Sequence, residues 1–218
     1  SKHPFRQICL TNLAIAYRKQ RVAVMLVDKP AVPGLSSVMP DNFKAGFQAA
    51  RHLLKLGHRR IAFLAAPPDP VVKARHEGFL SALRQAGVPF EKRDYIAGSY
   101  GTEKSTEAMM AYLKQRKRNL PTAILAINDE AALGVLRALQ AQKIPVPTRM
   151  SVMGFDDIPQ AADSNPPLTT MRIPRMEMGR LAAKTLFAQI ADPATSPMSV
   201  KLRTDLVIRK SCAKPKRS

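Results

Sequence analysis

The feature that most constrains the fold is the regular alternation of short apolar runs with amphipathic helical patterns. Predicted strands cover 8–11, 22–27, 61–65, 95–97, 123–127, 151–154 and 200–208, and predicted helices cover 13–19, 43–56, 73–86, 103–115, 129–142 and 175–191. Strands separated by helices form right-handed βαβ units, in which helices cover both faces of a parallel sheet. The sequence therefore predicts an α/β fold.

One stretch, 151–171, predicts a change of direction in the chain. A buried strand stops at Gly-Phe-Asp-Asp, a polar segment follows, and Pro166-Pro167 precede a new extended segment. Two consecutive prolines fit neither a helix interior nor a central strand. We interpret this stretch as a crossing from one lobe to another.

Composition excludes several classes of protein. Hydrophobic content of 45% and charged content of 23% are ordinary for a globular protein, and no apolar run is long enough for a bilayer. The amino-terminal residues lack the apolar core of a secretory signal, so we expect a cytoplasmic protein.

Net charge is +19, an excess that suggests an acidic partner such as nucleic acid. Basic residues are nevertheless spread along the chain. The two dense clusters, 114–118 and 214–217, are interpreted as a helix end, where cations suit the macrodipole, and a solvated tail. The net charge alone does not predict a DNA-binding protein.

The motifs of the commonest nucleotide-binding and hydrolytic sites are absent. There is no GxGxxG, no GxxxxGK[ST] and no GxSxG, and no nucleophile has a base beside it in the sequence pattern. Cys9 and Cys212 show no CxxC spacing, which predicts reduced thiols and no metal site. His58, beside Gly57, is interpreted as a structural residue of a turn. We expect a binding module with no catalytic residues, cofactor or metal.

Polar residues that follow predicted strands outline a candidate binding site. Ligands of open α/β sheets bind beyond the carboxyl ends of the strands. Arg75 follows the strand 61–65 after a loop, Asn128 follows 123–127, and Asp156 follows 151–154. Asp41 lies where the chain first enters this lobe. A guanidinium, an amide and carboxylates suit a polyhydroxylated ligand such as a sugar, or the edge of a purine.

Each candidate has a structural alternative. Asp129, next to Asn128, is favoured as an N-cap of the following helix. Asp41 and Asn42 form a helix-start pattern, and either residue is equally compatible with a capping role. Arg75 could be a solvated residue of a first helical turn, although arginine is disfavoured there. Of Asp156 and Asp157, one is expected to make local turn bonds while the other faces the crevice.

The order of several short motifs resembles the lac-repressor-like (LacI/GalR) family of bacterial transcription regulators. The resemblance covers roughly residues 8–211. Its motifs are GFDD and PPLTT within 154–170, PDNFKAG at 40–46, LLKLGHRRIAFL at 53–64, RHEGF at 75–79, PTAI with ND between 121 and 129, and IRKS at 208–211.

This resemblance implies a periplasmic-binding-protein-like core of two lobes, the first incomplete. The partial amino-terminal lobe would comprise 1–40 and 165–195, and the carboxyl-terminal lobe 41–160 and 199–211, with a disordered basic tail at 212–218. Three crossings would join the lobes, at 37–42, 158–168 and 192–199.

The resemblance also implies a function. A small effector, sugar-like or a purine or nucleoside, would bind between the lobes of a homodimer and control operator DNA binding by a helix-turn-helix headpiece absent from this sequence. Arg75, Asn128 and Asp156 match family positions that bond the effector, and Asp156 is the strongest candidate. The alternative is a periplasmic-type solute-binding protein for a sugar. An α/β enzyme, which would need a nucleophile or cofactor loop, is the third hypothesis.

Overall fold

The chain divides into two compact units. A computed structural model describes residues 16–17, 20, 22–116 and 119–216. Unit 1 comprises Ser1–Asp41 and Pro174–Arg203, and unit 2 comprises Asn42–Ile173 and Thr204–Ser218. Each unit has its own sheet.

Unit 2 is built on a six-stranded sheet with the order β4-β3-β5-β6-β7-β9. Its strands are β3 (Ile61–Ala65), β4 (Tyr95–Ala97), β5 (Ala123–Ala126), β6 (Ser151–Asp156), β7 (Thr169–Arg172) and β9 (Asp205–Val207). All neighbouring strands are parallel except β9, which is antiparallel to β7. Every residue of β3 and β5 is buried, as expected for the central strands of a sheet that is covered on both faces.

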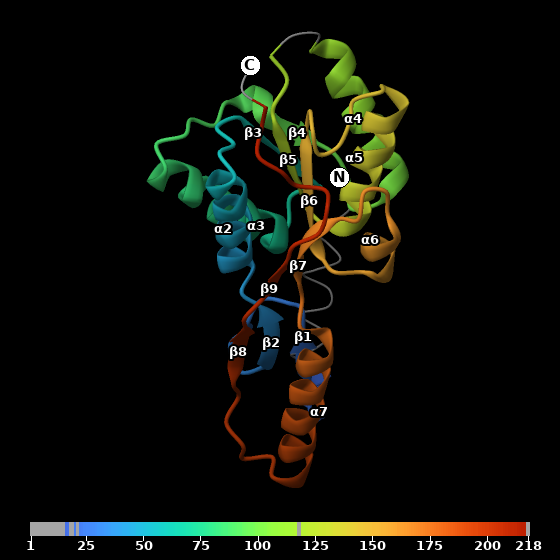
Figure 1. The fold of residues 1–218 in the computed structure, drawn as a ribbon. Coiled ribbons are helices and arrows are strands. Elements are labelled where there is room, and N and C mark those ends of the chain that lie inside the picture. The colour runs from blue at the N-terminus through green and yellow to red at the C-terminus, as the bar shows by residue number, and fades with distance from the viewer. Residues whose placement is uncertain (1–15, 18–19, 21, 117–118, 217–218) are drawn as a thin grey trace. The chain divides into compact units, whose positions relative to one another are not determined.

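Helices cover both faces of this sheet, so the predicted α/β fold is confirmed (Figure 1). The helix α2 (Asn42–Lys55) packs against α3 (Pro70–Gln85), and α4 (Thr102–Gln115) packs against α5 (Asp129–Ala141). A short 3₁₀ turn, η1 (Lys92–Asp94), precedes β4, and a short helix, α6 (Pro159–Asp163), follows β6.

The described part of unit 1 contains a smaller parallel sheet in the order β1-β2-β8 and the long helix α7 (Arg175–Ala191). Its strands are β1 (Met25–Val27), β2 (Ser36–Pro40) and β8 (Ser199–Leu202). The predicted strand at 8–11 and most of the predicted helix at 13–19 lie outside the described residues.

The buried face of α7 is partly polar. Apolar residues at helical spacing in 175–191 predict a buried stripe of Met178, Leu181, Ala182, Leu186 and Ile190, but Ile190 is 60% exposed, whereas Thr185 and Gln189 are buried. Gln189 donates a 2.7 Å hydrogen bond from Nε2 to Ser36 Oγ of β2. The hydrogen-bonded pair of Gln189 and Ser36 is therefore buried where hydrophobic periodicity predicts an aliphatic side chain.

The predicted strand 200–208 is two strands in two different sheets. β8 pairs with β2, with Val38 opposite Val200, and β9 pairs with β7, with Met171 opposite Leu206. The alternation of apolar and polar residues continues through both halves. The period therefore does not show where the pairing partner changes.

The crossing predicted within 158–168 is wrong. The segment stays in unit 2, where it forms α6 and leads into β7, whose Thr169 lies opposite Met153 of β6. The chain passes to unit 1 only after Ile173, and it returns after Arg203 rather than within 192–199. Residues 165–173 of the stretch 165–195 therefore belong to unit 2, because β7 extends the sheet beside β6.

The tail expected to be disordered packs against unit 2 as far as it is described. Ser211 O accepts a 2.9 Å bond from Val152 N, and Ala213 N donates to Ser151 Oγ at 3.1 Å. His58, which is buried, bonds Ala213 O through Nε2 at 3.0 Å, so its interpretation as a structural residue holds. Burial lowers the pKa of His58 to about 4. Burial also raises the pKa of Cys212 to about 11, which leaves an unreactive thiol.

Candidate functional site

The candidate site lies at the carboxyl ends of β3, β5 and β6 in unit 2. The structure brings together two of the predicted residues, Arg75 of α3 and Asp156 at the end of β6, with 3.5 Å between Arg75 Nη2 and Asp156 Oδ1. The arginine side chain is 6% exposed and the aspartate side chain 26%. A nearly buried cation therefore has a partner that solvent and ligands reach.

Arg75 is held in place by contacts on several sides. Its Nε donates to Asn42 Oδ1 at 2.9 Å, and its Nη1 donates to Ile127 O at 2.6 Å. The guanidinium carbon lies 4.6 Å from the centroid of the Phe155 ring, which is a cation–π distance. The alternative of a solvated arginine in a first helical turn is wrong, because α3 begins earlier, at Pro70.

The early start of α3 has a local cause. Asp69 Oδ1 accepts bonds from Val71 N and Val72 N, both at 2.8 Å, and caps the helix. Pro70 takes the first helical position, where its missing N–H costs nothing. Arg75 therefore falls in the second turn, where its side chain reaches inward.

Asn42 adds a further side chain to the candidate site, although the sequence alone predicts only a helix cap at this residue. It is 2% exposed, and while its Oδ1 accepts from Arg75, its Nδ2 has no hydrogen-bond partner among the described residues. An unsatisfied buried amide group is costly, which makes it a donor well suited to a bound ligand. Only the Asp-Asn helix-start pattern marked this residue in the sequence.

Asn128, rather than Asp129, caps α5. Asn128 Oδ1 accepts a 2.9 Å bond from Ala131 N, and the residue has the extended conformation of an N-cap. The prediction that Asp129 is the cap is wrong, because its side chain turns inward and is fully buried. The assignment of Asn128 to the ligand stays a prediction.

Asp129, in the first turn of α5, is hydrogen-bonded to β7 and to the segment that follows β6. Its Oδ1 accepts from Thr170 Oγ1 at 2.6 Å, and its Oδ2 accepts from Ile158 N at 3.0 Å. Gly154 makes this approach possible, since a methyl group at that position would lie 2.3 Å from Asp129 Oδ1. Burial raises the pKa of Asp129 to about 7, to which the nearby charge of Asp156 contributes.

This pKa predicts a pH-dependent stability. An acid whose pKa is raised on folding stabilises the protein fully below the unfolded pKa and loses that contribution as pH rises through the folded pKa, about 7. We expect the unfolding free energy of the wild type, relative to Asp129→Asn, to fall by roughly 2–4 kcal/mol between about pH 4 and pH 8. Urea unfolding of both chains measures it. A constant difference would contradict the raised pKa.

The adjacent carboxylates Asp156 and Asp157 have different partners. Asp157 accepts bonds from Arg172 Nε at 2.7 Å and Arg209 Nη2 at 2.6 Å. Burial acts to raise the pKa of Asp157, but the two arginines outweigh it and hold the pKa below its usual range. Asp157 thus makes the local bonds, and Asp156 is the residue paired with Arg75.

The backbone at this corner is unusual. Asp156 has φ 115° and Asp157 has φ 56°. The second value lies in the left-handed region that aspartate tolerates, whereas the first is rare for any residue with a side chain. Such strain costs on the order of 1–3 kcal/mol and concentrates at functional sites.

Asp41 is the last residue of unit 1 before α2 begins. Its N–H donates to Leu202 O at 2.8 Å, and it directly precedes Asn42 in the chain. Its role toward a ligand stays a prediction. No group of three side chains suited to a metal ion occurs within 16–17, 20, 22–116 and 119–216.

Comparisons with known proteins agree with this architecture. Residues 50–212 match the periplasmic binding protein-like domain family. The chain is 33% identical over 186 residues to the HTH-type transcriptional repressor PurR of Mannheimia succiniciproducens, covering 85% of this chain and 55% of the relative. It is 34% identical over 178 residues to the HTH-type transcriptional repressor CytR of Escherichia coli, covering 81% and 52%.

Solved structures of similar proteins include two with bound sugars. A LacI family transcriptional regulator from Enterococcus faecium with bound ribose has a TM-score of 0.82 at 30% identity, covering 91% of this chain and 73% of that one. The transcriptional regulator CelR in complex with cellobiose has a TM-score of 0.79 at 32% identity, covering 86% and 58%.

Fold and site together define a ligand-binding domain of the periplasmic binding protein-like class. The chain belongs to this family, and within it to the effector-binding domains of LacI/GalR transcription regulators. It spans about half the length of the curated relatives it matches. These relatives are transcription regulators, so the alternative of a periplasmic solute-binding protein is not favoured. Among the described residues, no helix has the length and apolarity needed to cross a membrane.

Proposed function

We propose that this chain binds a small polar effector at the carboxyl ends of β3, β5 and β6, as the sensing part of a transcription regulator. The observation that carries the proposal is the pair of Arg75 and Asp156, with the unsatisfied amide of Asn42 beside it. A fixed cation, a partly exposed carboxylate and an unused donor form a preorganised polar site. Asn128 and Asp41 complete the proposed contact set.

The chemistry of the site favours a hydroxyl-rich ligand. The Asp156 carboxylate accepts bonds from sugar hydroxyls, and Asn42 Nδ2 donates to a hydroxyl or ring oxygen. Stacking of a nucleobase would need an exposed aromatic face, but Phe155 is fully buried beneath the Arg75 guanidinium. Similar regulators bind ribose or cellobiose, which supports a sugar. A purine or nucleoside is the second candidate, since the edge of a base presents matching donors and acceptors.

Regulation follows from the family. The relatives are HTH-type repressors, so we infer that the complete regulator contacts operator DNA through a helix-turn-helix, acts as a homodimer in the cytoplasm, and changes its DNA affinity when the effector binds. The site holds binding groups but no nucleophile with a neighbouring base, which supports binding rather than catalysis.

Titration calorimetry with a panel of ligands tests the proposal. The panel holds ribose, glucose, cellobiose, adenosine and hypoxanthine, and the 218-residue chain is the protein. We expect saturable binding of at least one sugar. Binding of adenosine or hypoxanthine alone would support the second candidate. Absence of binding to both classes would overturn the proposed site.

A further inference from the structure

Positive charge is segregated within unit 2. Four stretches contain no Asp or Glu, namely 43–68, 108–128, 131–155 and 206–218. They include the segments that lead into β3, β5 and β6, and the carboxyl-terminal segment bonded to the first residues of β6. The carboxylates of the candidate site follow β5 and β6 at the other edge of the sheet. The edge formed by the amino ends of the strands is therefore cationic.

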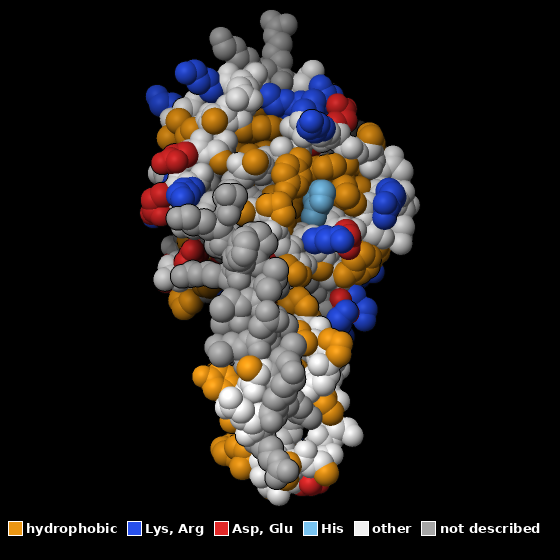
Figure 2. Space-filling model, turned by 180° about the vertical axis from the view of Figure 1, so that it is seen from behind, with side chains coloured by type: hydrophobic (Ala, Val, Ile, Leu, Met, Phe, Trp, Pro, Cys, Tyr) orange, Lys and Arg blue, Asp and Glu red, His pale blue; other side chains and the backbone are white. Residues whose placement is uncertain are grey.

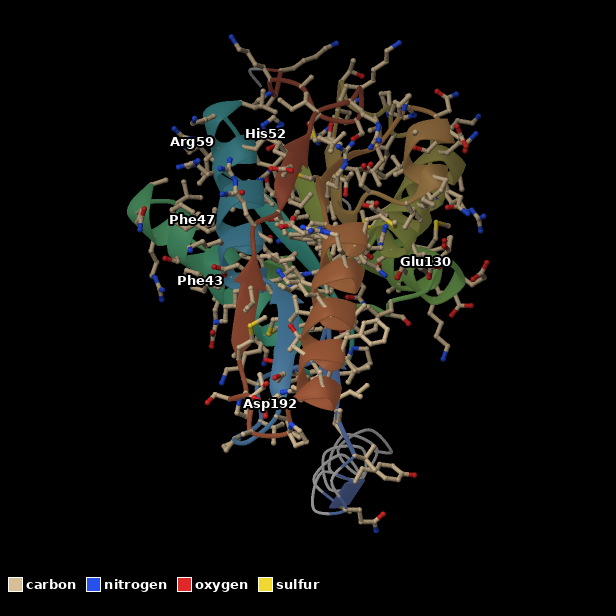
Figure 3. The ribbon with its side chains drawn as sticks, turned by 90° about the horizontal axis from the view of Figure 1, so that it is seen from below. Phe43, Phe47, His52, Arg59, Glu130 and Asp192 are labelled. Atoms are coloured by element: carbon tan, nitrogen blue, oxygen red, sulfur yellow. The ribbon has the colours of Figure 1, made fainter. Side chains whose placement is uncertain are left out.

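Four exposed basic side chains at this edge define what we call the amino-edge surface. They are Lys55, Arg59, Lys214 and Lys216. The two segments that carry them touch, because His58 bonds Ala213 O and a methyl group at Gly57 would lie 3.8 Å from Pro215 Cδ. Figure 2 shows Lys and Arg side chains gathered at the upper end of unit 2, and Figure 3 shows Arg59 on the outside of the fold.

These four cations lack ionic partners within the described part of the chain. The carboxylates that precede β4 do not supply them, since Asp94 pairs with Arg116 at 3.1 Å and Glu91 pairs with Arg93 at 2.5 Å. Arg59 Nη1 donates to the backbone carbonyls of Leu54 and His58. Within the described part of the chain, no carboxylate therefore offsets the charge of this surface.

Compensation of helix dipoles explains only part of this surface. Lys55 lies in the last turn of α2, where a cation is favourable. Arg59 lies beyond the helix, and Lys214 and Lys216 belong to a segment without helical structure that is anchored by backbone bonds. Fold stability therefore gives no reason for three of the four charges.

We propose that the amino-edge surface binds the phosphate backbone of duplex DNA without reading its sequence. Clustered, unpaired Lys and Arg are the electrostatic signature of such binding, and the chain's pI is about 10.5. Neither 52–60 nor 209–216 contains Phe, Tyr or Trp. Single-stranded nucleic acid would need such side chains for stacking, and protein partners usually need them as anchors. The contact lies apart from the candidate effector site and does not depend on the proposed effector.

The test is a salt titration of duplex binding. The affinity of the 218-residue chain for a fluorescent random-sequence duplex is measured by anisotropy at several salt concentrations. One variant carries Lys55→Gln, Arg59→Gln, Lys214→Gln and Lys216→Gln. The matched control removes the same charge from exposed residues of unit 1, with Arg175→Gln, Arg180→Gln, Lys184→Gln and Lys201→Gln. Circular dichroism checks that both remain folded.

We expect the amino-edge variant to lose tenfold or more in affinity at low salt, with the slope of log K against log salt reduced by roughly 3–4. The control variant should keep most of the affinity at low salt and most of the slope. Equal losses in the two variants would show a response to net charge alone and overturn the proposal. Equally effective competition by polyglutamate would assign the surface to an acidic protein and overturn it too.

Discussion

Replacement of Asp156 by Asn should weaken effector binding by about 10- to 150-fold, the cost of one charge-assisted hydrogen bond of 1.5–3 kcal/mol. The substitution keeps the shape of the side chain and removes the charge that faces Arg75 at 3.5 Å. It leaves a nearly buried guanidinium with one ionic partner fewer, and it removes the strongest acceptor for a ligand hydroxyl. Calorimetry with the tightest ligand of the panel gives the ratio of dissociation constants.

Glu130→Gln is the matched control for this result. Glu130 is an exposed carboxylate in the first turn of α5, next in sequence to the buried Asp129 (Figure 3). The substitution Glu130→Gln removes one negative charge, as Asp156→Asn does, but it leaves the contacts of Arg75 unchanged. Affinity should stay within about twofold of the wild type, since exposed charges contribute little. Equal affinities in the wild type and Asp156→Asn would remove Asp156 from the site.

Gly46→Ala should destabilise unit 2 by more than about 3 kcal/mol, because the added methyl group collides with the backbone of the facing helix. The added methyl group would lie 2.0 Å from Arg75 O, in the facing helix α3. The contact is reciprocal, since a methyl group at Gly78 would lie 2.0 Å from Phe43 O of α2. Relief requires α2 and α3 to separate, which also displaces Asn42 and Arg75. Urea unfolding measures the loss, and ligand affinity should fall with it.

Gly179→Ala supplies the opposite expectation. Gly179 also lies within a helix, α7, but a methyl group there meets no atom within 4 Å. Reduced freedom of the unfolded chain should make this variant more stable by roughly 0.5–1 kcal/mol. If both glycine variants changed stability by similar small amounts, the close contact of α2 and α3 would be in error.

Much of the fold could be predicted from local patterns. The boundaries of β3, β4 and α7 are those predicted, because each pattern is uninterrupted and bounded by turn residues or proline. β2 was missed because Ser36 and Ser37, although fully buried, look polar in sequence. Their burial is stabilised by partners far along the chain, such as the bond between Ser37 Oγ and Ser199 Oγ.

Part of the site could be predicted as well. The rule that ligands lie beyond the carboxyl ends of parallel strands selected Arg75 and Asp156 from the sequence, and the structure places these two side chains together. The assignment of the α5 cap to Asn128 rather than to Asp129 could not be predicted. It depends on the space at Gly154, which admits a buried carboxylate from a neighbouring element. The spacing of residues within 123–142 contains no information about the approach of the Asp129 carboxylate to Gly154.

The most direct test of the account is a crystal structure of the chain with the tightest ligand of the panel. We predict that a ligand hydroxyl lies within hydrogen-bond distance of the Asp156 carboxylate and that a ligand oxygen accepts a bond from Asn42 Nδ2. A ligand seated instead in the surface pocket lined by Leu136, Ile144 and Pro166 would contradict the assignment of the effector site.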